Sequence, residues 1–131
     1  MPFGLKDFQE IGPVRGFTPY TNADGTAAKS IWGAKPYPSR MDSIWACNDD
    51  VIAHVVVLWG DDGSTRFRLG SATVPGGAGV GGAPAYDVLT NALPSSQTGL
   101  VNDPFTDYWL SVDVAVALTK TLTICTFGGT F

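Results

Sequence analysis

A single histidine and two pairs of neighbouring aspartates are the residues of this chain best suited to acid–base chemistry. His54 lies in the run VIAHVVVLW, and the pairs Asp49-Asp50 and Asp61-Asp62 lie on either side of that run. A Ser-His-Asp site needs a serine and an orienting carboxylate that converge on the imidazole, and the sequence places neither. If the run is a strand, its two ends are roughly 30 Å apart at about 3.3 Å per residue. We therefore expect the aspartates to be turn residues, and His54 to be a hydrogen-bonded residue of the sheet.

Two cysteines, Cys47 and Cys125, are the remaining candidates for covalent or metal chemistry. The chain has no Cys-x-x-Cys and no His-x-x-x-His pair, so no zinc site is expected. The sequence leaves open two reduced thiols that pack as small hydrophobes, or a disulfide between the first and last core strands. A calcium ion at one aspartate pair is a further alternative, because oxygen ligands suit it. The main expectation is a protein with no metal and no cofactor.

Three glycines, Gly77, Gly79 and Gly82, form a literal G-x-G-x-x-G motif. Dinucleotide binding requires a helix that starts at the last glycines, within a βαβ unit. Here Ala-Pro-Ala follows, and no parallel βαβ pattern is evident. We interpret residues 75–84 as a flexible connector, predict no catalytic or cofactor-binding residue, and expect that the protein is not an enzyme.

The composition favours a single domain that buries surface against partners. Of 131 residues, 44% are apolar and only 15% are charged, against a usual charged share of roughly 25%. A net charge of −4 gives no basic footprint for nucleic acid. No run approaches the roughly 18 apolar residues of a membrane span, and residues 1–25 lack a secretory pattern. We expect synthesis in a cytoplasm, with no nucleic-acid or membrane partner.

Residues 41–131 are predicted to form an all-β domain, an antiparallel β-sandwich of the jelly-roll or Greek-key kind. The β-branched and alternating runs predict five to seven strands, of which the clearest are 41–48, 51–60, 65–74, 108–119 and 121–127. Residues 51–74 are predicted to form a hairpin with Arg66 and Arg68 facing outward. Residues 85–93 are ambiguous between strand and helix. The connectors at 75–84 and 94–107 favour crossing between sheets.

The alternation also predicts the core. Its expected members are Ile44, Ile52, Val56, Leu58, Phe67, Leu69, Val112, Val114, Val116, Leu122 and Ile124.

Residues 1–40 differ in character and are predicted to form an extended N-terminal arm. They contain five prolines and six aromatic residues with almost no periodic pattern. Proline resists helices and central strands, while aromatic residues at this frequency are not typical of a disordered tail. The arm either wraps its own sandwich or docks on another subunit, and docking is favoured. The predicted anchors for a partner are Phe3, Phe8, Phe17, Tyr20, Trp32 and Tyr37.

About 90 of the 131 residues resemble small virion proteins of tailed bacteriophages. The similar stretches are RMDSIWACND from residue 40, VIAHVVVLWGDDGSTRFRLGSATVPGGAGVGGAP from residue 51, and the ending ALTKTLTICTFGGTF. They follow a pattern of a strand, a hairpin with DG at its tip, an LGS-x-TVP-x-G-x-G segment and a K-x-L ending with GG. These motifs are structural, and residues 1–39 match no part of the pattern.

The resemblance implies a capsid decoration (cement) protein with a jelly-roll-like core. Its partner would be the major capsid protein, its location the capsid surface of the virion, and its state a homo-oligomer, a dimer or trimer. One alternative is a head–tail or tail accessory component. Another is a carbohydrate-binding or receptor-binding module, in which tryptophans such as Trp45, Trp59 and Trp109 offer a stacking face.

Overall fold

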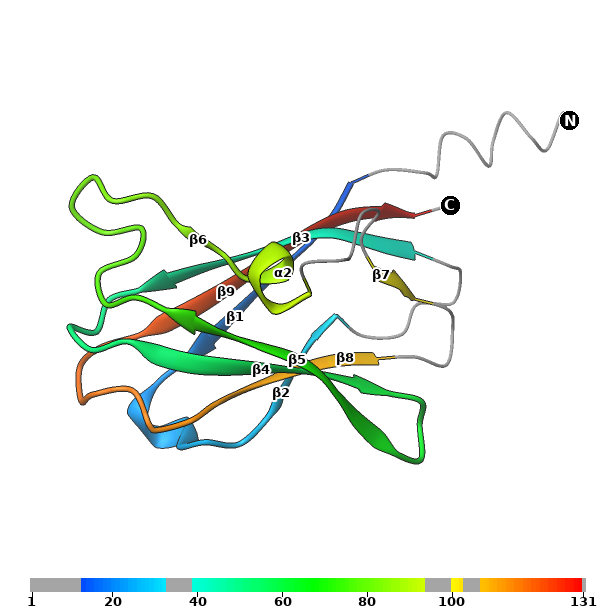
Figure 1. Cartoon of the computed structure of the whole chain (residues 1–131), viewed down its shortest axis with the longest axis horizontal. Coiled ribbons are helices and arrows are strands. Elements are labelled where there is room, and N and C mark those ends of the chain that lie inside the picture. The colour runs from blue at the N-terminus through cyan, green and yellow to red at the C-terminus, as the bar shows by residue number, and fades with distance from the viewer. Residues whose placement is uncertain (1–12, 33–38, 94–99, 103–106, 131) are drawn as a thin grey trace, which may run out of the picture.

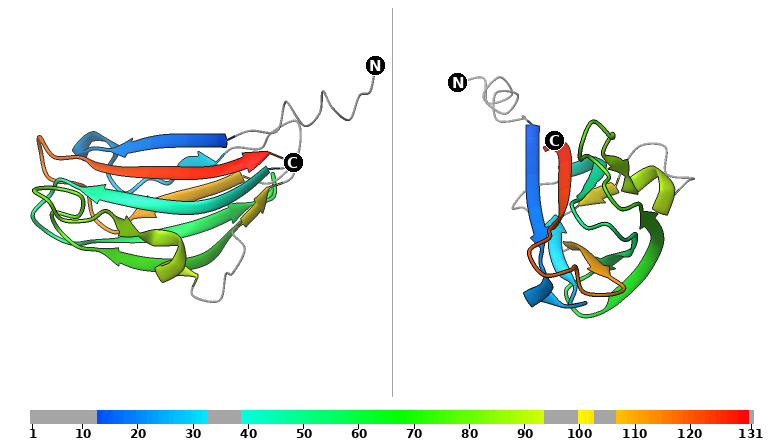
Figure 2. Two further views of the ribbon diagram at one scale, coloured as in Figure 1. Left: turned by 90° about the horizontal axis from the view of Figure 1, so that it is seen from above. Right: turned by 90° about the vertical axis from the view of Figure 1, so that its left-hand side faces the viewer.

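Two antiparallel sheets pack face to face in the computed structural model, which describes residues 13–32, 39–93, 100–102 and 107–130 (Figure 1). Sheet A has the order β1 (Pro13–Tyr20), β9 (Leu122–Thr130), β3 (Ser39–Asn48) and β6 (Tyr86–Asp87), and β7 (Leu100–Asn102) also pairs with β3. Sheet B has the order β2 (Lys29–Trp32), β8 (Asp107–Val112), β4 (His54–Asp61) and β5 (Arg66–Val74). Seen from one end, β1 and β9 lie on one side of the molecule and β5 on the other (Figure 2). The predicted all-β antiparallel sandwich is confirmed, while the jelly-roll path stays a prediction.

The segment between residues 13 and 32 contributes a strand to each sheet. β1 pairs with β9 from Pro13 to Tyr20, and β2 pairs with β8. Both are edge strands, and an edge strand tolerates proline because one side of its backbone needs no sheet partner. The short 3₁₀ helix η1 (Asn22–Asp24) turns the chain between them. The irregular arm predicted over residues 1–40 is therefore corrected for this segment, which is part of the sandwich.

Two aromatic side chains fix this segment to the core. Tyr20 and Trp32 are almost fully buried. The Tyr20 hydroxyl donates a hydrogen bond of 2.6 Å to the carbonyl oxygen of Leu110, which joins sheet A to sheet B. Burial raises the pKa of the Tyr20 hydroxyl well above its usual value, so this donor stays protonated.

The hairpin predicted over residues 51–74 is confirmed as β4 and β5, and Arg66 and Arg68 are exposed as expected. The strand begins at His54 and not at residue 51. A bulge between Leu58 and Trp59 shifts the pairing by one residue. The hairpin tip beyond the bulge lies outside the packed core, which leaves Phe67 exposed.

The core prediction is right for seven of its eleven members and wrong for four. The predicted core residues that are buried are Ile44, Val56, Leu58, Val112, Val116, Leu122 and Ile124. Ile52, Phe67, Leu69 and Val114 are exposed. Ile52 precedes β4 and Val114 follows the end of β8, so neither has a sheet position from which to face inward.

The ambiguous residues 85–93 contain a strand and a helix in turn, β6 followed by α2 (Val88–Ala92). The Asp87 side chain caps the helix by accepting a hydrogen bond from the Thr90 amide. The helix lies against β5, where a side chain at Gly70 would come 2.3 Å from the carbonyl oxygen of Ala92. Glycine at this position therefore lets helix and strand approach.

Candidate functional site

Four connections lie at one end of the sandwich, on the left in Figure 1, and we call them the loop end. They are residues 21–28, 49–53, 75–85 and 113–121. Backbone hydrogen bonds join three of them: the Gly77 amide donates to the Asp50 carbonyl and the Asp49 amide to the Thr121 carbonyl. The Asn22 side chain donates to the carbonyl of Val116, which connects the fourth. The loop end is therefore one hydrogen-bonded unit.

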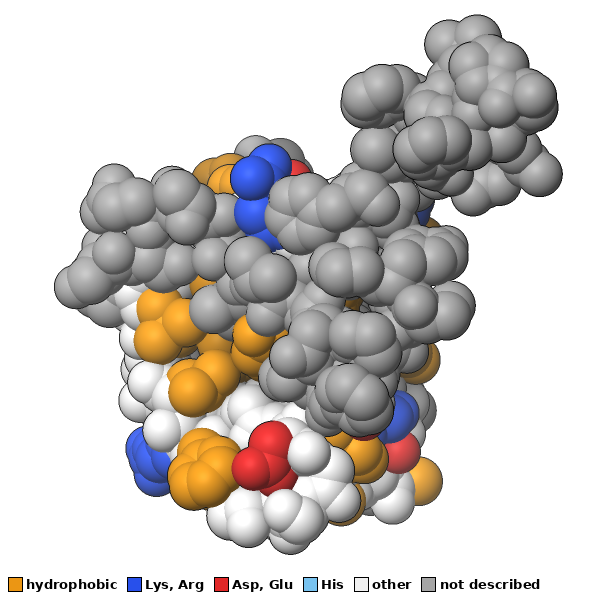
Figure 3. Space-filling model, turned by 90° about the vertical axis from the view of Figure 1, so that its right-hand side faces the viewer, with side chains coloured by type: hydrophobic (Ala, Val, Ile, Leu, Met, Phe, Trp, Pro, Cys, Tyr) orange, Lys and Arg blue, Asp and Glu red, His pale blue; other side chains and the backbone are white. Residues whose placement is uncertain are grey.

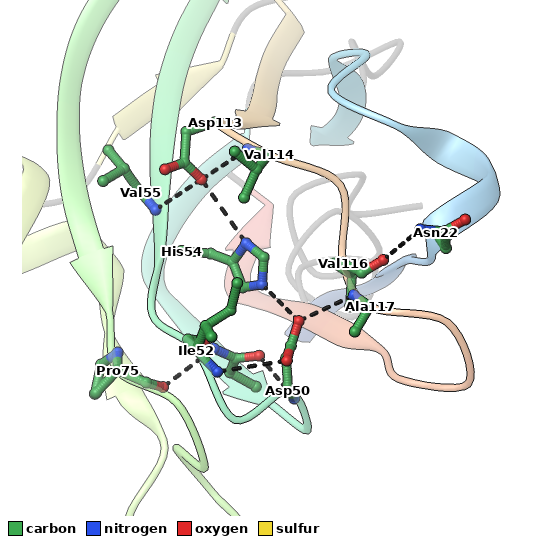
Figure 4. Close-up of polar contacts among 11 residues, drawn as sticks. Asn22, Asp50, Ile52, His54, Val55, Pro75, Asp113, Val114, Val116 and Ala117 are labelled. Carbon is green, nitrogen blue, oxygen red and sulfur yellow. Dashed lines mark hydrogen bonds and ion pairs between the residues drawn. The ribbon is translucent and has the colours of Figure 1, made fainter.

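Beneath these loops, His54 and Asp50 form a buried polar pair (Figure 4). The His54 Nε2 atom lies 3.0 Å from Asp50 Oδ2, and this pair belongs to the first residue of β4 and the loop before it. The same Asp50 oxygen accepts a hydrogen bond of 2.9 Å from the Ala117 amide. One carboxylate thus connects the loop at 49–53 to the loop at 113–121.

Asp113 completes the cluster from the other side of the imidazole. Its Oδ1 atom lies 3.7 Å from His54 Nδ1, which is an ion-pair distance and not a hydrogen bond. The same oxygen accepts hydrogen bonds from the Val55 and Val114 amides. Because this carboxylate takes up the Val55 amide of β4 and the Val114 amide that follows β8, the strand stops at Val112 and the chain turns away.

Asn48 is also fully buried, and it joins the glycine-rich connector to the loop at 49–53. Its side-chain amide donates to the carbonyls of Ile52 and Pro75, and its side-chain oxygen accepts from the Asp50 amide. A side chain at Gly76 would lie 2.3 Å from the carbonyl oxygen of Val51, so the connector and the loop at 49–53 are in close contact.

Glycines give the connector its path. Gly77, Gly79 and Gly82 all have positive φ angles, which glycine adopts without strain. No helix starts at the last of them, because β6 follows the connector. The literal dinucleotide motif therefore lies in a loop that is hydrogen-bonded to its neighbours, whereas the sequence predicted a flexible connector.

The electrostatics of the cluster favour an ionised Asp50. The Ala117 amide, together with the His54 side chain, lowers the pKa of this carboxyl to about 2. Within the described ranges, both atoms that face the imidazole nitrogens belong to carboxylates, and no group of His, Cys, Asp and Glu side chains is arranged to hold a metal ion. What this geometry can do is position loops, and the expected hydrogen bond of His54 within the sheet is confirmed.

This pair gives a pH prediction. The folded-state pKa of Asp50 lies below the ordinary value of 3.8, so the charged carboxylate stabilises the fold above about pH 4 and that contribution is lost as the pH falls towards 2. We expect Asp50→Asn to be less stable than wild type at pH 7, and the difference to narrow between about pH 4 and pH 2. Denaturant unfolding at each pH measures it. Asp49→Asn, at the exposed neighbour, is the control and should follow wild type; an equal gap at every pH would contradict the assignment.

The surface of the loop end carries exposed aliphatic side chains beside charged ones such as Asp49 and Asp113. Its exposed large hydrophobic residues are Val51, Ile52, Val80, Val114 and Leu118, with 85% of Val51 and 74% of Leu118 accessible. The opposite end, which faces the viewer in Figure 3, places hydrophobic side chains beside acidic and basic ones in its described part. Sequence reasoning missed the loop end because it assigned four of these residues to strands and only Val80 to a connector. The sequence feature that could have indicated these loops is the position of Asp50 and Asp113, each of which directly precedes an exposed valine.

Of the six predicted arm anchors, the three that the structure describes differ in exposure. Phe17 is 64% exposed on β1. Tyr20 and Trp32 are buried in the sandwich and are not available to a partner, which corrects their predicted role. Phe3, Phe8 and Tyr37 lie outside the described residues.

Trp59 and Trp109 are direct neighbours across β4 and β8. The Arg66 guanidinium lies 4.3 Å from the centre of the Trp109 ring, and the Trp59 indole donates to Ser111. The Trp109 ring is therefore already stacked against a cation, whereas the Trp59 hydrogen bond uses the indole N–H and not a ring face.

The two cysteines are free thiols, which agrees with the first of the alternatives left open by the sequence. Both are partly exposed on sheet A, and burial raises the pKa of the Cys125 thiol.

Comparison with protein-family models, with curated proteins and with solved structures finds no match to the chain. Among the residues that the structure describes, no helix has the length and apolar character to cross a membrane.

Proposed function

We propose that this protein is a virion structural protein of a tailed bacteriophage, a decoration protein that binds the capsid shell through its loop end. The observation that carries the proposal is the set of exposed aliphatic side chains at that end, above all Val51 and Leu118. Exposed apolar side chains that gather at one end of a molecule mark protein interaction sites. The partner we propose is the major capsid protein, in line with the sequence resemblance.

The buried pair under the loops supports this use of the loop end. A docking surface loses less conformational entropy on binding when its loops are already held in one arrangement. Asp50 is hydrogen-bonded to His54 and to the Ala117 amide, so the loops that carry Val51 and Leu118 share one anchor. Burial of the exposed aliphatic groups then contributes roughly 25 cal/mol per Å².

The low charge of the chain supports a place in an assembly. Only 15% of its residues are charged, and surfaces of low charge are a liability for a free monomer. A tail or head–tail accessory component shares this property, and copy number separates the two.

Stoichiometry is the first experiment. Particles that contain the protein are purified, and its amount is compared with that of the major capsid protein by quantitative gel densitometry. A ratio near one, or a simple fraction of one, supports the decoration role. A few copies per particle overturns it in favour of a neck or tail component, and absence from particles overturns the virion assignment and restores the receptor-binding alternative.

A variant tests the surface itself. We expect the double substitution Val51→Asp with Leu118→Asp to weaken binding to purified shells at least about tenfold, because two carboxylates would be buried at the contact. Co-sedimentation with shells measures it. Phe67→Asp is the matched control, since Phe67 is also exposed but lies at the opposite hairpin tip. Equal saturation by both variants would exclude the loop end as the docking surface.

A further inference from the structure

The outer face of sheet A carries an aromatic row that the loop end does not include. The strand register places nine side chains on this face in three columns: Arg15, Phe17 and Pro19 on β1, Thr123, Cys125 and Phe127 on β9, and Ser43, Trp45 and Cys47 on β3. Their neighbours along the strands, such as Ile124 and Ala46, are buried between the sheets. The nine residues therefore face away from the core, and we call them the sheet A face.

Aromatic rings dominate the sheet A face. Phe17, Trp45 and Phe127 are exposed. Phe17 and Phe127 contact each other edge to face, with ring centres 6.3 Å apart. Arg15 is the one charged member among the nine. Depletion of charge with enrichment in aromatic residues is the signature of the centre of a protein interface.

We propose that two copies of this chain pair through the sheet A face, with a two-fold axis that runs along β9. The columns of β1 and β3 lie on either side of β9 in register, so such an axis places Phe17 of each copy opposite Trp45 of the other. Cys125 then faces its own equivalent, and so does Phe127. This pairing is independent of shell binding.

The charges agree with this arrangement. The axis places Arg15 opposite Ser43 of the second copy, so the charged member of the face does not meet a like charge. Nearby, Arg40 forms an ion pair with Asp42 on β3 at 2.6 Å, which leaves little net charge at that margin. Self-pairing of a face requires such self-complementarity.

The size of the face sets the strength of the pair. Eight-residue strands at about 3.4 Å per residue, spaced about 4.8 Å apart, give a face of roughly 27 Å by 14 Å. Two such faces bury on the order of 800 Å², below the size of a stable complex. We therefore infer a weak, concentration-dependent dimer, with a dissociation constant of roughly 10–100 µM.

Sedimentation velocity of the full chain, from about 1 µM to about 500 µM, tests the pairing. The weight-average mass should rise towards twice that of the monomer. Phe17→Ser should raise the dissociation constant at least about tenfold, while Phe67→Ser, at an exposed position on the other sheet, should leave it unchanged. A chain that stays monomeric at the highest concentration, or a dimer that Phe17→Ser does not weaken, would overturn the proposal.

Cys125 provides a second, independent readout. A short bis-maleimide, which adds one thiol across each of its double bonds, should join two copies through Cys125 at high concentration. Cys47→Ser should retain the covalent dimer and Cys125→Ser should lose it, because only Cys125 lies on the proposed axis. A single-site maleimide establishes that both thiols react. Cross-linking that persists in Cys125→Ser would place the contact elsewhere. Because neither measurement uses capsid shells, failure here leaves the proposed function standing, and failure of shell binding leaves the dimer standing.

Discussion

Trp32→Ala lowers the free energy of unfolding by an expected 3–5 kcal/mol, roughly the cost of removing a large aromatic side chain from a packed core. Trp32 is 3% exposed and lies on β2, which pairs with β8 at the edge of sheet B. Loss of the indole leaves a cavity that the edge strand alone cannot close. Chemical denaturation followed by circular dichroism measures the change.

Phe17→Ala is the matched control. Both aromatic residues belong to the segment predicted to be an arm, but Phe17 is 64% exposed. Its removal should change the unfolding free energy by no more than about 0.5 kcal/mol, measured in dilute solution where the chain is monomeric. If Trp32→Ala proved equally mild, residues 13–32 would not be part of the sandwich, and a detachable arm would be the better description.

The contrast between these two aromatic residues shows why the N-terminal segment was misassigned. Proline argues against a central strand, and that argument is right, but Pro13 and Pro19 lie in an edge strand. Whether a strand lies at an edge depends on sheet order, which sequence periodicity does not contain. Thus an irregular stretch was predicted where β1 forms.

The parts that could be predicted from sequence are those where local pattern and tertiary position agree. The hairpin of β4 and β5 has β-branched residues, alternation and a turn with Asp and Gly, and each signal predicts the same structure. Leu122 and Ile124 alternate with outward residues on β9 and are buried as expected.

Strand ends could not be predicted because long-range polar contacts determine them. The sequence continues to alternate after Val112, yet β8 stops there. Asp113 takes up the Val55 and Val114 amides with its side chain, and Val55 is distant in the sequence. An alternation rule cannot detect such a contact, so Val114 was predicted to be core and is exposed.

The candidate site illustrates the same limit. His54 was correctly predicted to be a bonded sheet residue, but its partner is Asp50, which the sequence assigned to an ordinary turn. The Ala117 amide, 67 positions away in the sequence, donates to the same Asp50 carboxylate. Because this contact is long-range, no local sequence pattern indicates it. Val51 and Leu118 lie on the two loops that this contact joins.

The second large effect is expected from His54→Ala, which should lower the free energy of unfolding by about 3 kcal/mol. The imidazole is fully buried, so its loss leaves a cavity. It also removes the imidazole N–H that donates a hydrogen bond to the Asp50 carboxylate. The loops at 49–53 and 113–121 would then share a weaker anchor. Denaturant unfolding measures the stability, and co-sedimentation measures binding to shells.

His54→Gln separates the hydrogen bond from the packing, because its amide can still donate to Asp50. We expect it to recover part of the lost stability and, with it, part of the shell binding. The comparison with Val51→Asp and Leu118→Asp then distinguishes positioning from contact. Substitution at His54 should lower stability and binding together, whereas the surface substitutions should lower binding alone. If His54→Ala were as stable as wild type, the buried pair would not be what holds the loop end in place. Other contacts would then have to position the loops that carry Val51 and Leu118.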